Sequence, residues 1–327
     1  MKLTFPLLRL PENVIIKVLK NLWLSQLYLF KFSLVSSETK NLVTSLGLKA
    51  SDVDIIISRS IRVAVYVGKN LKNHLTLDFY KDSNDQNAVA DISLSVDAPF
   101  DYEGTRIQTS ILFNFSNWLN HIQSLFCLNP PLNVFFYQGC ERFEVQSLKD
   151  AIRNVNFLSL FNQINVLSRE VLKHFNTPSR LFLWMNPFEE ACQIQQVFLQ
   201  NFETIAFRNF FSLDDMLLAN SVRVDLCHPI SQKQFNQFVK HWIRGSNPRL
   251  QYMHLPIDKT DFASGVVYLK GIRCMEMSED AKKEIREKHK LPVNVDMIQI
   301  RRNDGTPAVI ESKDLDDRIH IRLIVLH

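Results

Sequence analysis

The chain has 327 residues, of which 46% are hydrophobic and 22% are charged. This composition is typical of a globular protein and not of a disordered or fibrous one. Only 8 residues are glycine, which disfavours glycine-rich phosphate-binding loops because few positions can take a positive φ freely. The formal net charge of +4 forms no long basic stripe, so we expect no nucleic-acid partner.

Five cysteines occur without any CxxC pair, a pattern that indicates reduced thiols in the cytoplasm or nucleus. Pro6, Arg9 and Pro11 interrupt the N-terminal segment, so it does not have the apolar core of a signal peptide. The most apolar stretch, residues 14–35, contains three lysines, which argues against a membrane-spanning helix. We therefore expect a cytoplasmic or nuclear protein with no membrane partner.

The first 50 residues predict three short helices. Leu10, Pro11 and Glu12 open the first helix, because proline fits the first turn and an acid complements the positive helix N-terminus. The other two are expected at 25–32 and 36–46. The second helix is apolar almost all round, so it must be covered on all sides, and roughly 40 residues are too few to do this alone. Either the rest of the chain or another protein covers it.

These features, in this order, resemble an F-box. The resemblance rests on the Leu-Pro-Glu sequence at 10–12, the leucine-rich second helix and the Leu-Val-Ser sequence at 34–36. The tryptophan common near the start of the third helix is absent, and Glu-Thr-Lys stands at 38–40. The resemblance implies binding to a Skp-type adaptor and, through it, to a cullin-based ubiquitin ligase. We expect the contact to use apolar residues of this segment: Leu10, Pro11, Ile15, Ile16, Leu19, Leu27, Leu29 and Val35.

A domain boundary is expected near residue 50, with a docking module at 1–50 and a target-recognition domain at 51–327. Beyond it, β-branched and aromatic runs predict strands at 54–58, 61–67, 75–80 and 88–96. From residue 113 onward, helices and strands alternate. A helix is expected at 114–127, and strands at 132–137, 164–167, 181–184, 204–207, 222–226 and 250–255.

These later strands begin 17 to 32 residues apart. Leucine-rich repeats have a period of about 20–29 residues. The average spacing of these strands agrees with that period, but the spacing varies more than in a regular repeat. We predict a chain of the α+β or α/β class, in which the three-helix module precedes an irregular leucine-rich-repeat-like β/α domain with a mostly parallel sheet. A compact doubly wound sheet is the alternative.

A further helix is predicted from residue 231. Ser231 and Gln234 form a capping box, and Gly245 can take the left-handed conformation that ends a helix. Between them, apolar residues recur at helical spacing: Phe235, Phe238, Val239, Trp242 and Ile243. We expect this stripe, Trp242 included, to belong to the core. A shorter helix is expected after Ser212.

The segments at 212–220 and 235–250 resemble the type 2 F-box-associated domain of nematode proteins. The second carries Lys-His-Trp-Ile-Arg-Gly-Ser-Asn-Pro-Arg-Leu at 240–250, and residues 300–306 resemble the end of that domain. The resemblance implies target recognition and supplies no catalytic residues. After it, a helix is expected at 278–290, a hairpin at 297–312 around Asn303-Asp304-Gly305, and a last strand at 318–326.

No GxSxG, Walker, GxGxxG or HExxH motif occurs, so we expect no enzyme activity, no cofactor and no metal. Two functions remain open. The chain is either the substrate adaptor of a ubiquitin ligase or a non-ligase interaction scaffold whose N-terminal helices cap the β/α domain. Target binding is expected at polar and aromatic residues on the strands or at their ends: Tyr137, Trp184, Arg208, Arg223, Asp225, Tyr252 and His254.

Overall fold

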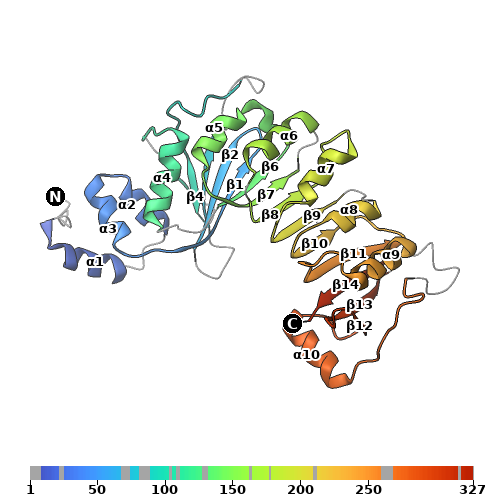
Figure 1. Cartoon of the computed structure of the whole chain (residues 1–327). Helices are drawn as coiled ribbons and strands as arrows, with labels where there is room; N and C mark the ends of the chain where they lie inside the picture. Colours follow the sequence, from blue (N-terminus) through green and yellow to red (C-terminus); the bar gives the residue numbers. More distant parts are fainter. Residues whose placement is uncertain are drawn as a thin grey trace. The chain divides into compact units, whose positions relative to one another are not determined.

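The computed structural model describes residues 9–21, 26–67, 74–80, 89–102, 105–107, 111–126, 132–161, 164–176, 178–208, 212–258, 268–315 and 318–326. The chain combines helices with mixed β-structure and is of the α+β class. It divides into two compact units, whose helices and strands are labelled in Figure 1. Unit 1 contains residues 1–158 and 170–177, and unit 2 contains residues 159–169 and 178–327.

Unit 1 begins with the three predicted helices, α1 (Glu12–Asn21), α2 (Gln26–Ser33) and α3 (Ser37–Thr44). Ser36 caps α3. Its side chain accepts a hydrogen bond from Thr39 N at 3.2 Å, and Thr39 Oγ1 accepts one from Ser36 N at 2.9 Å. This reciprocal pair satisfies donors that a helix N-terminus otherwise leaves without partners.

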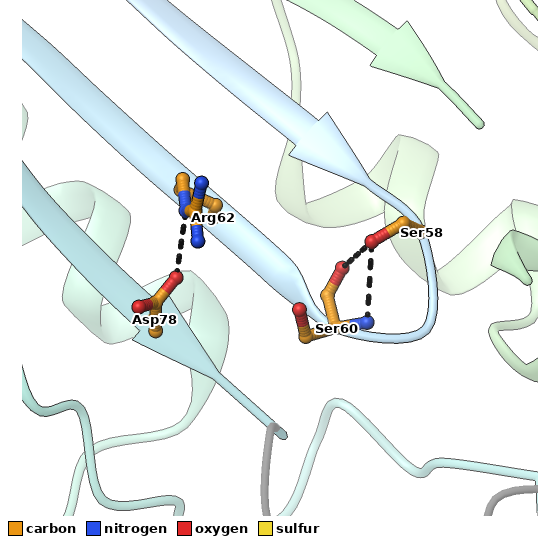
Figure 2. Close-up of polar contacts among 4 residues, drawn as sticks. All are labelled: Ser58, Ser60, Arg62 and Asp78. Atoms are coloured by element: carbon orange, nitrogen blue, oxygen red, sulfur yellow. Dashed lines mark hydrogen bonds and ion pairs between the residues drawn. The ribbon is translucent and has the colours of Figure 1, made fainter.

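The sheet of unit 1 is mostly antiparallel. Its strands are β1 (Ala50–Ile57), β2 (Ile61–Val67), β3 (His74–Phe79), β4 (Phe100–Tyr102), β5 (Thr105–Ile107) and β6 (Leu132–Phe136). Their order is β6-β1-β2-β3-β4-β5, and only the β1–β6 pair is parallel. Figure 2 shows the turn between β1 and β2, where Ser58 Oγ donates to Ser60 O at 3.2 Å. It also shows Arg62 on β2 paired with Asp78 on β3 at 2.8 Å. Arg62 is half exposed, so this pair contributes about 0–1 kcal/mol.

Two strand predictions are wrong. Within the predicted strand at 88–96, the described residues form a turn between isolated bridges from Ala90 and Val96. The Asp91 side chain accepts from Ser93 N at 2.8 Å, a local bond that competes with extended pairing. The predicted strand at 164–167 is the start of α6 (Asn165–His174), and the strand of that region comes earlier, as β7 (Val155–Leu160).

Unit 1 also contains α4 (Phe115–Leu125) and α5 (Val145–Ala151). The first was predicted and the second was not. Phe115, Trp118, Leu119 and Ile122 of α4 are at most 2% exposed, because their spacing places them on one face of the helix. Phe79 of β3 packs against Phe115 and Trp118, with ring centroids 5.4 and 6.2 Å apart.

Unit 2 opens with four parallel strands, β8 (Arg180–Leu183), β9 (Thr204–Phe207), β10 (Arg223–Leu226) and β11 (Tyr252–Asp258). Helices α7 (Ala191–Phe198), α8 (Leu213–Leu218) and α9 (Gln232–Arg244) connect them. After α10 (Glu279–His289), the sheet is completed by β12 (Asp296–Arg301), β13 (Pro307–Leu315) and β14 (Arg318–Val325). The order is β8-β9-β10-β11-β14-β13-β12. The pairs formed by β14 with β11 and β13, and by β13 with β12, are antiparallel, so the sheet is mixed.

The predicted helix from residue 231 is confirmed as α9. Ser231 and Gln234 form the capping box, and Gly245 ends the helix at φ 116°. Phe235, Phe238, Val239 and Trp242 are fully buried. Asn247 follows at φ 52°, and its side-chain amide donates to three carbonyls at the end of α8, those of Met216, Leu217 and Ala219. Asn247, which follows α9 in the chain, therefore stabilises the end of α8, the helix before α9.

Among the helices of the described ranges, none is both long enough and apolar enough to pass through a bilayer.

Candidate protein-interaction surfaces

The N-terminal helices are packed onto the rest of unit 1 through α2. Phe30 is fully buried, and its ring lies 5.1 Å from Phe100, 6.5 Å from Trp118 and 5.8 Å from His121, measured between centroids. Ser33 at the end of α2 lies 2.9 Å from His121, from Oγ to Nε2. Other residues of unit 1 therefore cover much of α2, the helix for which the sequence alone did not identify a packing partner.

His121 is held in this contact as a neutral ring. Burial, with a smaller effect from the positive charge of Lys40, lowers the pKa of His121 to about 4. The Ser33 hydroxyl donates to Phe30 O at 2.6 Å, so its oxygen is left to accept from His121 Nε2. Protonation of His121 would place a positive charge in this buried contact between α2 and α4.

The eight predicted docking residues do not share one environment. Ile15, Leu19 and Leu29 are 2%, 4% and 6% exposed and lie inside the module, where α3 packs against α1 and α2. Leu10 and Ile16 are half-buried, Pro11 is exposed, and Val35 is 68% exposed. The side chain of Leu27 lies outside the described residues. The accessible members are thus Leu10, Pro11, Ile16 and Val35.

Two further apolar side chains of this module are exposed, and the sequence reasoning did not select them. They are Val14 on α1 at 37% and Tyr28 on α2 at 56%. Tyr28 belongs to the run that appeared apolar on all sides, and the structure leaves it facing solvent. Its hydroxyl is the signal that could have distinguished it, because tyrosine is often found with a polar tip in water.

In unit 2, several predicted target-binding residues lie on one side of the sheet, and Val224 and Leu226 lie on the other. Strand pairing places the predicted residues in rows that cross neighbouring strands. One row runs Phe182, Ala206, Asp225, His254, Arg322 and Glu311, and the neighbouring row includes Arg180, Thr204, Arg223 and Tyr252. On β10, Val224 and Leu226 are 2% and 4% exposed, while Arg223 is exposed and Asp225 is half-buried. The predicted alternation of β10 is confirmed.

Trp184 and Arg208, which directly follow β8 and β9, are stacked. The guanidinium carbon of Arg208 lies 3.3 Å from the centroid of the Trp184 ring, a cation–π arrangement. Phe161 and Phe182 extend the aromatic cluster, with centroids 5.4 and 6.3 Å from Trp184. Neither phenylalanine was selected from the sequence. Tryptophan, tyrosine and arginine are the residue types that dominate interface energies, so this cluster is suited to protein binding.

The row that contains Asp225 brings several ionisable side chains next to one another. His254 Nδ1 lies 3.9 Å from Asp225 Oδ1, and its Nε2 lies 3.2 Å from His320 Nδ1. Burial, followed by the charges of His320 and Arg322, lowers the pKa of His254 to about 4, so the ring is neutral near pH 7 and its contact with Asp225 is not an ion pair. Burial raises the pKa of Asp225, and Arg223 opposes the shift.

Glu311 and Arg322 complete this row, and neither was predicted. Arg322 Nη1 lies 3.3 Å from both carboxylate oxygens of Glu311, which is 1% exposed. Burial raises the pKa of Glu311, and the adjacent Arg322 opposes the shift. Glu311 is buried and the Arg322 side chain is 26% exposed, so loss of Arg322 would leave a buried carboxylate without its charge partner. The pair therefore holds the row in place.

A hollow of about 280 Å³ lies beside these rows, where α10 ends. It is lined by Arg223, Tyr252, Lys288, His289, Lys290, Leu291 and Arg322. The Arg223 guanidinium carbon lies 4.2 Å from the Tyr252 ring centroid. Two of the predicted target-binding residues therefore line a mainly basic recess. Tyr137, 37% exposed, belongs to unit 1, so it is not grouped with the other six.

Two family models match separate segments of the chain. The F-box domain model matches residues 7–51, and the model described as F-box associated matches residues 193–255. The chain therefore carries a segment similar to an F-box, followed by one similar to an F-box-associated domain. The F-box associated domain-containing protein sdz-33 of Caenorhabditis elegans is 26% identical over 255 residues, which cover 77% of this chain and 78% of that protein. The resemblance to nematode F-box proteins is confirmed. No solved structure matches the chain.

The two matched segments correspond to defined structural elements. The first contains α1, α2 and α3, and the second extends from α7 to most of β11. The second segment therefore includes Arg208, Arg223, Asp225, Tyr252 and His254, together with the Asn247 contact to α8. Over the described ranges, histidine, cysteine and acidic side chains form no cluster that could hold a metal ion.

Proposed function

We propose that the chain is a substrate adaptor of a cullin-based ubiquitin ligase. Its N-terminal helices dock a Skp-type adaptor, and its C-terminal domain holds the target protein. The observation that carries the proposal is the F-box match at residues 7–51, on a module whose Pro11 and Val35 are exposed. A specific interface needs roughly 800 Å² from each partner, and Leu10, Ile16, Tyr28 and Val14 add to the available apolar area.

In this proposal the buried residues Ile15, Leu19 and Leu29 shape the module, and the accessible ones make the contact. Target binding is assigned to the sheet rows of unit 2, with Trp184, Arg208, Arg223, Asp225, Tyr252 and His254 as contact residues, and to Tyr137 in unit 1. The β/α part of unit 2 is interpreted as leucine-rich-repeat-like, in which an exposed sheet face forms the binding surface. The ligase assignment implies residence in the cytoplasm or nucleus and a non-catalytic role.

Co-purification with a recombinant Skp-type adaptor tests the docking step. Pro11→Ala combined with Ile16→Asp removes one accessible apolar contact and introduces a charge at another, so adaptor recovery should fall strongly. Pro292→Ala combined with Val293→Asp is a matched control, since Val293 in unit 2 is 76% exposed. Recovery of the adaptor at wild-type yield by the Pro11/Ile16 variant would show that this face is not the docking site.

A second candidate is a non-ligase scaffold in which the N-terminal helices cap the following domain. The packing of Phe30 against Phe100 and Trp118 favours it, because a cap needs this contact. The same co-purification separates the two functions. A scaffold of this kind does not retain the adaptor in either variant or in the wild type.

A further inference from the structure

Unit 2 contains a second cleft, built around the C-terminal half of α9. It has a volume of about 640 Å³, within the range of roughly 300–1,000 Å³ that ligand pockets occupy. Three segments form it: α9 itself, residues 271–275, and the end of β12 with the turn that follows. The lining residues lie outside the two sheet rows described above.

The charge of this cleft is unusual for a protein of net charge +4. Five of its ten lining residues are cations and none is an acid. The cations are Lys240, Arg244, Arg273, Arg301 and Arg302. Like charges brought together around one cavity repel, and each one raises the free energy of adding the next. An anion in the cleft removes this repulsion.

Two of these cations are fixed by contacts with the protein. Arg302 has only 9% of its side chain exposed. Its Nη2 donates to Gly245 O at 2.5 Å, and its Nε lies 3.5 Å from Asp304 Oδ2. Arg301 Nη1 donates to Gly305 O at 3.0 Å. The guanidinium groups at this wall are therefore oriented before any ligand arrives, which lowers the entropy cost of binding.

The other three cations are not neutralised by a carboxylate in the part of the protein that the structure describes. Within the described ranges, Lys240, Arg244 and Arg273 form no ion pair with a carboxylate. Arg244 and Arg273 are exposed at the mouth, and Lys240 is half-buried. Gly271, at φ 72°, brings the chain close to Lys240, since an added Cβ would lie 3.5 Å from its Nζ. Apolar side chains also line the cleft, those of Ile243, Ile272 and Met275.

We propose that this cleft binds an acidic segment of a partner protein, in which several Asp or Glu side chains flank an apolar residue. The five cations come from three separate segments, so they match a row of carboxylates better than a single charged group. Arginine pairs with carboxylates through two parallel hydrogen bonds, and the three apolar residues cover the side chain between them. The recess is local and joins no long basic stripe, which disfavours a nucleic acid.

The site is additional to the proposed ligase docking and does not depend on it. The binding assay therefore contains only the full chain and a fluorescent synthetic peptide, rich in Asp and Glu around a leucine. Parallel assays use the same peptide with Asn and Gln in place of the acids, a phosphoserine peptide with neutral flanks, and a single-stranded oligonucleotide. We expect the acidic peptide to bind most tightly and its dissociation constant to rise with salt, because the contacts are electrostatic.

The decisive variant is Arg244→Glu with Arg273→Glu, both at exposed positions without ion pairs in the described ranges. It should weaken binding of the acidic peptide at least about tenfold, as loss of charge pairs does at other interfaces. Lys233→Glu with Lys283→Glu makes the same change in net charge at exposed sites outside the cleft and should alter binding less than about twofold. If the reversal variant does not fold, Arg244→Gln with Arg273→Gln is used instead. Equal affinity of the cleft and control variants, or tighter binding of the amide peptide, the phosphopeptide or the oligonucleotide, overturns the proposal.

Discussion

The side-chain amide nitrogen of Asn247 lies 2.9 Å from the carbonyl oxygen of Ala219. The same nitrogen lies 3.0 Å from Met216 O and 3.2 Å from Leu217 O. A helix leaves its last carbonyls without partners inside the helix, and here one amide from beyond α9 satisfies them at the end of α8. Asn247 is 4% exposed, so solvent has little access to these carbonyls in the folded chain.

Asn247→Ala should lower the free energy of unfolding by about 1–3 kcal/mol, the usual cost of leaving buried polar groups unsatisfied. Additional strain comes from the backbone, because φ is 52° at this position and alanine avoids positive φ. Asn247→Gly is the matched control, since it removes the amide and relieves the strain. Denaturant unfolding should rank wild type above the glycine variant and the glycine variant above the alanine variant. Equal midpoints would show that the amide bonds contribute nothing.

Trp242 is expected to be structural, since it is fully buried in the stripe of α9. Trp242→Ala should cost about 3–5 kcal/mol, as large-to-small changes in protein cores do. Trp242→Phe should cost less because more of the volume is filled. Thermal melting of the two variants measures this order. An alanine variant that melts like wild type and loses a partner would make Trp242 a contact residue.

Acid should loosen the contact between α2 and α4. The pKa of His121 is about 4 in the folded chain and 6.5 in its unperturbed state, so between these values the unfolded chain binds a proton that the folded chain does not. The stabilisation from neutral His121 is therefore complete above pH 6.5 and is lost as the pH falls towards 4, by up to about 3 kcal/mol.

The matched variant for this prediction is His121→Gln, which keeps a polar side chain near Ser33 and does not titrate. Its free energy of unfolding should fall less than that of wild type between pH 7 and pH 4.5. Because His254 is also shifted to about 4, the comparison between the two proteins is informative, whereas either pH profile alone is not. Parallel profiles would contradict the assignment to His121.

Charge exchange on β10 tests the target surface. Arg223→Glu with Asp225→Arg should abolish capture of the proteins that the wild-type chain retains in cells with the proteasome blocked. The control is Lys283→Glu with Glu284→Lys, two exposed neighbours on α10 whose exchange should leave capture unchanged. Quantitative mass spectrometry compares the captured proteins, and circular dichroism checks the fold. Undiminished capture by a folded β10 variant would move the target site away from these rows.

Elements whose ends and faces are set by neighbouring residues in the sequence were predicted well. The capping box at Ser231, the apolar stripe that follows and the glycine at 245 define α9 without any long-range information, and the structure confirms all three. The alternation of Arg223 and Asp225 with buried neighbours likewise predicted one face of β10.

What depends on distant partners could not be predicted in the same way. Glu311 and Arg322 are neighbours because β13 and β14 pair in one register, which inspection of each strand by itself does not reveal. Residues 164–167 were assigned to a strand because short apolar runs do not distinguish strands from helices. Phe30 became buried through contacts with Phe100 and Trp118, which lie far away in the sequence.

Buried and outward-facing residues alternate along β10 and β11, and this has a consequence for sequence divergence. Val224, Leu226, Met253 and Leu255 maintain the core, while Arg223, Asp225, Tyr252 and His254 alternate with them along the same two strands. Replacement of a residue of the second set alters the outward surface and leaves the buried set unchanged. If this side of the sheet binds the target as proposed, substitutions there can change which protein is recognised while the residues that form the core stay the same.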